Sequence, residues 1–146
     1  MILYLDTSAL VKRYLAEDGT ADVGHWVRQA RPAATSLITR AEMGAAITRA
    51  VRLNWITPLQ GETALHRFRA EWEMLARLPI HELTVLRADV LACRHVLRGF
   101  DAVHLACAMI YCESLGEPIS LATYDRALWQ AAQSEGLAVL PVELPK

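Results

Sequence analysis

Short apolar runs alternate with segments of helical periodicity along the whole chain, and this alternation limits the possible folds. We expect strands near residues 2–5, 33–38, 79–85, 119–123 and 137–140. Helices are expected near residues 7–16, 20–30, 39–53, 58–78, 86–97, 100–114 and 124–134. Strands that alternate with helices form a parallel sheet covered by helices on both faces. With no linker or internal repeat, the 146 residues are expected to form one α/β domain, 1–146.

Composition excludes several classes of protein. The chain is 53% hydrophobic and 21% charged, which is typical of a globular domain and not of a disordered one. No apolar run reaches the length of a membrane helix, and the N-terminus lacks the basic region of a secretory signal. Three cysteines without CxxC spacing argue against a zinc site and against a disulfide framework. We therefore expect a cytoplasmic protein with no membrane segment.

Four acidic residues stand where helices are expected to begin. Asp6 and Asp125 follow the first and fourth strands, and Glu42 and Asp101 lie in the first turns of their helices. Each has an ordinary explanation as a helix cap or a first-turn anion. Glu42 also completes a capping box with Thr39. However, the flanks of Asp6 and Asp101 are apolar, whereas exposed caps usually have polar neighbours. We therefore predict one acidic cluster at the carboxyl edge of the sheet.

An acidic cluster needs a compensating charge. Two like charges about 4 Å apart repel by roughly 4 kcal/mol at an effective dielectric constant near 20. Several carboxylates can share a pocket only if some are protonated or a cation neutralises them. Oxygen ligands suit Mg²⁺ or Mn²⁺ better than zinc. Such an ion can position a phosphodiester, activate water and stabilise the leaving oxygen.

Four blocks around these acids resemble the signature of the PIN-domain family, and more narrowly the VapC toxins of bacterial toxin–antitoxin pairs. The blocks are LDTSALVK (5–12), SLITRAE (36–42), LRGFDAVHLA (97–106) and LATYDRAL (121–128). The resemblance implies a three-layer α/β/α fold with four to five parallel strands in the order 3-2-1-4-5. It also implies a Mg²⁺- or Mn²⁺-dependent endoribonuclease with a catalytic quartet, of which Asp6, Asp101 and Asp125 bind the metal. The four catalytic acids are Asp6, Glu42, Asp101 and Asp125.

Supporting residues are expected around the quartet. The resemblance suggests that the Thr123 hydroxyl orients the last acid or a metal-bound water. Ser8 and Thr7 are expected to hydrogen-bond Asp6 or to cap its helix. His104 lies one turn after Asp101 on the same helical face, where it could contact substrate or orient an acid. We favour a buried histidine that is hydrogen-bonded within the fold.

Basic residues near the acids are candidate contacts to RNA phosphates, because backbone contacts carry most non-specific affinity. Solvated helix faces show the same pattern, so both interpretations stay open. The five candidates are Lys12, Arg13, Arg40, Arg98 and Arg126. The resemblance points to structured RNA such as transfer RNA or a ribosomal RNA loop, although the sequence does not name the target.

Three other functions are less consistent with the sequence. A phosphotransferase of the haloacid-dehalogenase type needs an aspartate two residues after the first one, where this chain has Ser8. A phospho-receiver module needs a lysine after the fifth strand, where Pro141 stands. A non-catalytic binding module would not need all four acids. A PIN-domain nuclease of RNA maturation or decay, without an antitoxin, stays open as the alternative.

The resemblance also implies a cognate antitoxin whose C-terminal segment wraps the toxin. Large apolar side chains on the helices of the first half could receive it, or could form the core and a homodimer contact. These are Trp26, Ile47, Val51, Trp55, Leu65, Phe68 and Trp72.

Overall fold

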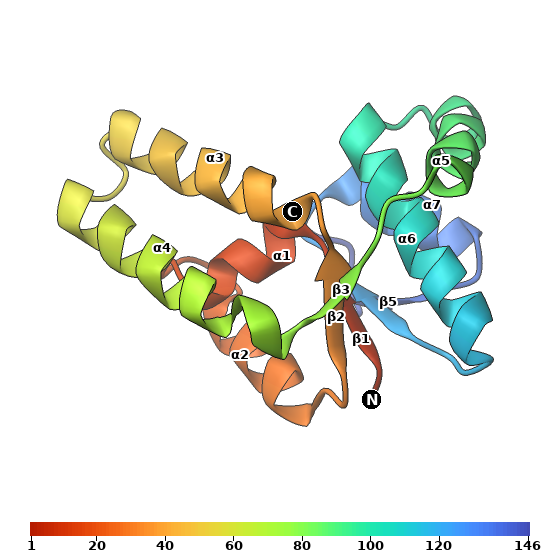
Figure 1. The fold of residues 1–146 in the computed structure, drawn as a ribbon, viewed down its shortest axis with the longest axis horizontal. Coiled ribbons are helices and arrows are strands. Elements are labelled where there is room, and N and C mark those ends of the chain that lie inside the picture. The colour runs from red at the N-terminus through yellow and green to blue at the C-terminus, as the bar shows by residue number, and fades with distance from the viewer.

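The computed structural model describes all 146 residues around a five-stranded parallel sheet (Figure 1). Its strand order is β3-β2-β1-β4-β5, which confirms the predicted order. The first strand is therefore central, and the crossover to β4 changes direction there. The strands are β1 (Leu3–Leu5), β2 (Ala33–Ser36), β3 (Ala76–Leu78), β4 (Ser120–Ala122) and β5 (Ala138–Leu140).

Helices cover both faces of the sheet, as the α/β/α expectation requires (Figure 1). One layer comprises α1 (Thr7–Leu10), the 3₁₀ turn η1 (Val11–Arg13), α2 (Thr20–Gln29), α3 (Thr39–Arg52), α4 (Pro58–Glu71) and the 3₁₀ turn η2 (Trp72–Met74). The other comprises α5 (Glu82–His95), α6 (Gly99–Leu115) and α7 (Arg126–Ser134). None of these helices combines the length and the apolar character needed to cross a membrane.

The central strand shows why both faces must be covered. Leu3 and Leu5 are buried in the core beneath α1 to α4, whereas Tyr4 is buried in the core beneath α5 to α7. Successive side chains of a strand point to opposite faces, so a strand that is apolar at every position must be sandwiched.

The prediction for the third strand was wrong. Residues 79–85 were expected to be a strand, but β3 is Ala76–Leu78 and pairs with β2, and residues 82–85 open α5. The Thr84 hydroxyl accepts a hydrogen bond from the His81 N–H at 3.2 Å, a capping contact that starts the helix despite the β-branched Thr84 and Val85. The helix expected to reach residue 78 accordingly ends at Glu71. The first helix is also shorter than expected and continues as η1.

Candidate active site

A cavity of about 520 Å³ opens at the carboxyl edge of the sheet, between α3 and α6. The cavity brings together the four predicted acids, which come from the ends of β1 and β4 and from the first turns of α3 and α6. Most of the residues that line it are polar or charged. The lining residues are Asp6, Thr7, Ser8, Glu42, Ala45, Ala46, Arg49, Arg98, Phe100, Asp101, His104 and Asp125.

Asp6 is buried, and both of its carboxylate oxygens accept hydrogen bonds. Oδ1 accepts the Ala9 N–H at 2.9 Å, so Asp6 also caps α1. Oδ2 accepts the Thr123 hydroxyl at 2.7 Å, and the Ser8 hydroxyl lies 2.8 and 2.9 Å from the two oxygens. Burial raises the pKa of Asp6, and the charge of His104 and these hydrogen bonds oppose the rise. The cap and the cavity acid are therefore the same side chain.

Thr123 connects Asp6 to Asp125. The Thr123 hydroxyl donates to Asp6 and accepts the Asp125 N–H at 3.0 Å. Ser8 extends the connection, because its hydroxyl accepts the Tyr124 N–H at 2.8 Å. These two hydroxyls fasten the loop after β4 to the loop after β1. Both Ser8 and Thr123 thus hold acids in place, as expected.

Asp101 and Asp125 share one cation. The Arg98 guanidinium donates from Nε to Asp101 Oδ2 and from Nη2 to Asp125 Oδ2, both at 3.0 Å. Burial raises the pKa of Asp101, and the negative charge of Asp125 raises it further. The two carboxylates are therefore close enough to repel each other, and Arg98 partly compensates. Asp125 also caps α7 by accepting the Leu128 N–H at 2.9 Å.

Glu42 does not form the predicted capping box. The helix α3 has no side-chain cap, and the Thr39 hydroxyl instead lies 2.7 Å from that of Thr35. Glu42 Oε1 accepts the Thr7 hydroxyl at 2.7 Å and lies 2.6 Å from Nε2 of His104. The backbone places the start of α3 over the cavity, so Glu42 turns towards polar partners there and not back along its own helix.

His104 is buried, and it also orients an acid. Its Nδ1 lies 2.7 Å from the Tyr4 hydroxyl, and its Nε2 faces Glu42. An ionised carboxylate can only accept, so Nε2 of His104 donates to Glu42. Burial would raise the pKa of Glu42, but the hydrogen bond and charge of His104 hold it below its usual value. Glu42 is therefore kept ionised.

Comparison with known proteins identifies this arrangement. Residues 3–138 match the family model described as PIN domain. The chain is 34% identical to Ribonuclease VapC45 of Mycobacterium tuberculosis over 98% of this chain and 97% of the relative. It is also 34% identical to Ribonuclease VapC35 of the same species, over 95% and 96%. The chain is a PIN domain of the VapC type.

A solved structure shares the same fold at low sequence identity. A toxin–antitoxin complex from Klebsiella pneumoniae superposes with a TM-score of 0.60 and 20% identity, over 86% of this chain and 87% of that one. At this identity the likeness supports the fold alone.

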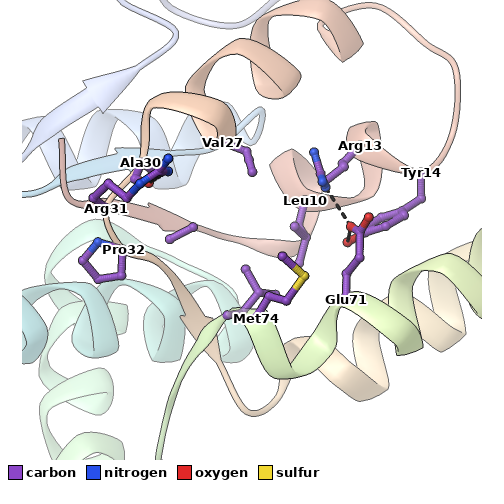
Figure 2. A pocket seen from close by; sticks show the side chains of 11 residues that line it. Leu10, Arg13, Tyr14, Val27, Ala30, Arg31, Pro32, Glu71 and Met74 are labelled. Carbon is purple, nitrogen blue, oxygen red and sulfur yellow. Dashed lines mark hydrogen bonds and ion pairs between the residues drawn. The ribbon is translucent and has the colours of Figure 1, made fainter.

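Three of the five predicted RNA contacts in this PIN domain are engaged elsewhere. Arg13 Nε donates to Glu71 Oε2 at 2.9 Å, beside a separate cavity of about 230 Å³ that contains none of the four acids (Figure 2). Lys12 lies 4.3 Å from the centre of the Tyr124 ring. Arg40 lies over Phe68 and Trp72. Arg98 alone among the five lines the acidic cavity, whereas Arg126 has no ion pair.

Two residues of the PIN-domain cavity, Arg49 and Phe100, were not predicted as site residues, and a third, Thr7, has a different partner than expected. Arg49 lies two helical turns after Glu42, so the helical period could have placed it on the same face. Thr7 was expected to hydrogen-bond Asp6 or cap its helix, but its hydroxyl donates to Glu42, a contact that only the tertiary structure reveals. Phe100 also lines the cavity, and its place immediately before Asp101 was the available signal.

Proposed function

We propose that this VapC-type PIN domain is a divalent-metal-dependent endoribonuclease and the toxin of a toxin–antitoxin pair. The observation that carries the proposal is the meeting of four carboxylates, from four separate parts of the chain, on one open cavity. The relatives named ribonucleases, at 34% identity over nearly the whole chain, support RNA as the substrate. Transfer RNA or a ribosomal RNA loop is the proposed target class.

The donor set suits Mg²⁺ or Mn²⁺. No three acidic, histidine or cysteine side chains are close enough together to enclose one ion directly. Mg²⁺ sites usually use one or two carboxylates and keep several water molecules, so this spacing is compatible with a hydrated ion. Asp101 and Asp125 already converge on one positive charge, that of Arg98. We therefore propose that Asp101 and Asp125 would hold the ion, and that Asp6, which lines the same cavity, would add a third negative charge.

When bound, the ion would position the phosphodiester, activate a water molecule and stabilise the leaving oxygen. Asp6 contributes a negative charge whose orientation is maintained by Ser8 and Thr123. Glu42 is kept ionised by His104, and its Oε2 carries no hydrogen bond, so that oxygen can accept a proton from the attacking water. Arg98 and Arg49 can pair with the RNA phosphates on either side of the cut.

Expression in cells, followed by mapping of new RNA 5′ ends, tests the proposal and names the target. We expect discrete new ends with the wild-type chain and none with Asp6→Asn. In vitro, cleavage should need Mg²⁺ or Mn²⁺ and stop in EDTA. Calorimetric titration with Mn²⁺ provides an independent measurement, and Asp101→Asn should weaken binding at least about tenfold. Cleavage that persists unchanged in EDTA would contradict the metal mechanism.

The alternative is a PIN-domain nuclease of RNA maturation or decay that has no antitoxin. The neighbouring reading frame separates the two, because a toxin should lie beside a small protein with a DNA-binding N-terminus. Co-expression of that protein should yield a complex without RNase activity. A purified chain that neither binds it nor loses activity would favour the housekeeping nuclease.

The surface predicted to receive the antitoxin is smaller than expected. Ile47, Phe68 and Trp72 are buried in the core and cannot contact a partner. Trp55 is 70% exposed and lines a cavity of about 480 Å³ with Leu59 and Leu15. We propose that an apolar side chain of the antitoxin binds here, since a groove beside a helix suits such an anchor.

A further inference from the structure

A solvent-exposed aromatic ring lies at the rim of the acidic cavity. Phe100, in the first turn of α6, is 57% exposed and immediately precedes Asp101. It lines the acidic cavity and also an adjoining cavity of about 400 Å³, which is bounded by Glu42, Arg98, Gly99 and Asp101. The ring therefore lies beside the path by which any polymer must reach the carboxylates.

Exposure by itself carries no argument, because single exposed apolar residues are common on protein surfaces. The neighbours of Phe100 make it different. Arg98 and Arg49 line the same cavity, and Arg49 has no ion pair. Surfaces that bind single-stranded nucleic acid combine cations for the phosphates with an aromatic ring on which a base stacks. The rim of this cavity supplies both groups.

We infer that Phe100 is the stacking platform for an unpaired base next to the scissile phosphate. The inference rests on the proposed ribonuclease function. A base within a duplex is covered on both faces by its neighbours and cannot offer a face to the ring, whereas a base in a loop can. Phe100 thus acts on substrate choice through the nucleotide beside the cut, while the carboxylates act on the phosphate.

The salt dependence of RNA binding distinguishes base stacking from contacts with the phosphates. The four acids repel the RNA backbone, and the arginines would contact its phosphates, which are the same for every base, so neither kind of charge can discriminate among bases. Stacking adds affinity that does not depend on salt in the way that phosphate contacts do. Removal of the ring should therefore weaken binding about equally at low and high salt, and removal of Arg49 should lower the salt dependence.

The test uses the full chain in an Asp6→Asn background, so that the RNA stays intact. Binding of fluorescein-labelled ten-nucleotide single-stranded oligoribonucleotides is measured by anisotropy, with the matching duplex in parallel. Phe100→Ala should raise Kd for the single strand about tenfold. Phe100→Trp should keep the affinity and show quenched indole fluorescence on binding. Leu115→Ala, at an exposed apolar residue at the C-terminal end of α6, is the matched control and should bind as the parent does.

Abasic oligonucleotides locate the stacked base. Removal of one base should weaken binding of the parent at a single position of the strand. The same removal should have no further effect in Phe100→Ala, because the partner ring is already absent.

Three results would overturn the inference. Equal affinities of Phe100→Ala and its parent would exclude stacking while leaving the ribonuclease proposal intact. Weaker binding accompanied by a change of molar mass in light scattering would assign the ring to a contact between copies of the chain. If the parent binds none of the oligonucleotides, the ribonuclease proposal itself falls, and the stacking inference falls with it.

Discussion

At the scale of single residues, the acids of the cavity combine a structural and a chemical task. Asp6 and Asp125 each accept a backbone N–H at the start of a helix while they face the cavity. Capping keeps the carboxylate in one rotamer, and helix N-termini favour negative charge. A change from aspartate to asparagine keeps an acceptor oxygen for the cap and removes the charge. The two tasks can thus be separated by mutation.

Asp6→Asn and Asp101→Asn should abolish RNA cleavage without unfolding the chain. Loss of one charged group that stabilises a transition state typically costs about 10²–10³ in rate. The free energy of unfolding in EDTA should stay within about 1 kcal/mol of wild type, or rise, because repulsion in the metal-free cluster is relieved. Cleavage assays and urea melts measure both quantities. Near wild-type cleavage by both variants at saturating Mg²⁺ would refute the proposed mechanism.

At the scale of elements, α3 and α4 pack closely where a glycine lies between them. A Cβ on Gly61 of α4 would collide with Cγ2 of Val51 at the end of α3. A Cβ added to Gly44, within α3, would meet no other atom. Gly61 therefore permits the close contact between α3 and α4, whereas Gly44 makes no such contact and only weakens its own helix.

Gly61→Ala should lower the free energy of unfolding by about 1–3 kcal/mol, because overpacking forces the helices apart. Gly44→Ala should raise it by about 0.5–1 kcal/mol, because alanine has less backbone freedom to lose in a helix. Urea denaturation of both variants and of the wild type measures the two changes in the free energy of unfolding. The same sign of change in both variants would contradict the packing argument.

A second link joins η1 to α4 through the Glu71 carboxylate. Glu71 accepts from Arg13 at 2.9 Å and from the Tyr14 hydroxyl at 2.7 Å (Figure 2). Burial would raise the pKa of Glu71, but its hydrogen bonds to Arg13 and Tyr14 outweigh burial and hold the pKa below its usual value of 4.5. A carboxylate with a lowered pKa stabilises the fold above its unfolded pKa and loses this contribution as the pH falls through its folded pKa.

Glu71→Gln should therefore lower stability by about 1 kcal/mol at pH 7. The difference from wild type should shrink progressively below pH 4.5 and vanish once the wild-type carboxyl is protonated. Urea melts at a series of pH values measure this change. A difference that is constant with pH would show that packing, and not the charge, causes the loss. RNA affinity should be unaffected, since this link lies outside the acidic cavity.

At the scale of the whole molecule, α5 leaves an apolar stripe uncovered. Leu83, Leu86 and Val90 are all exposed and, at spacings of three and four residues, lie on one face of the helix. A contiguous apolar face of this kind often marks a contact with another chain. We propose that this face of α5, and not the helices of the first half, forms a homodimer contact.

Leu86→Glu should raise the dimer dissociation constant about 30-fold or more, because it places an unpaired charge in an apolar contact. Light scattering across a concentration series measures the molar mass. Leu59→Glu, a change of the same type at an exposed site on α4, should leave the mass unchanged. A wild-type chain that stays monomeric at about 100 µM would remove the homodimer from the proposal.

The helices and the four acids were predicted better from the local sequence than the third strand was. The four acids and all seven α-helices were located from helix caps, apolar periodicity and breakers, which act over a few residues, although the ends of α1, α4 and α5 differ from the prediction. The third strand was misplaced because residues 79–85 have β-forming side chains while residues 76–78 have little pattern. Pairing of Ala76–Leu78 with β2 outweighed that local preference. Glu42 was recognised as a site acid, but its partner His104 lies 62 residues away and could not be inferred.

The sequence by itself determined the alternation of strands and helices, the sandwiching of the central strand, and the four carboxylates at helix starts. These features depend on side-chain period, capping and burial, each of which is encoded within one turn or one strand. Only the tertiary structure decided which groups meet across the cavity: Arg98 with two aspartates, His104 with Glu42, and Phe100 at the rim. Such meetings depend on how distant elements pack, and packing is a property of the whole chain.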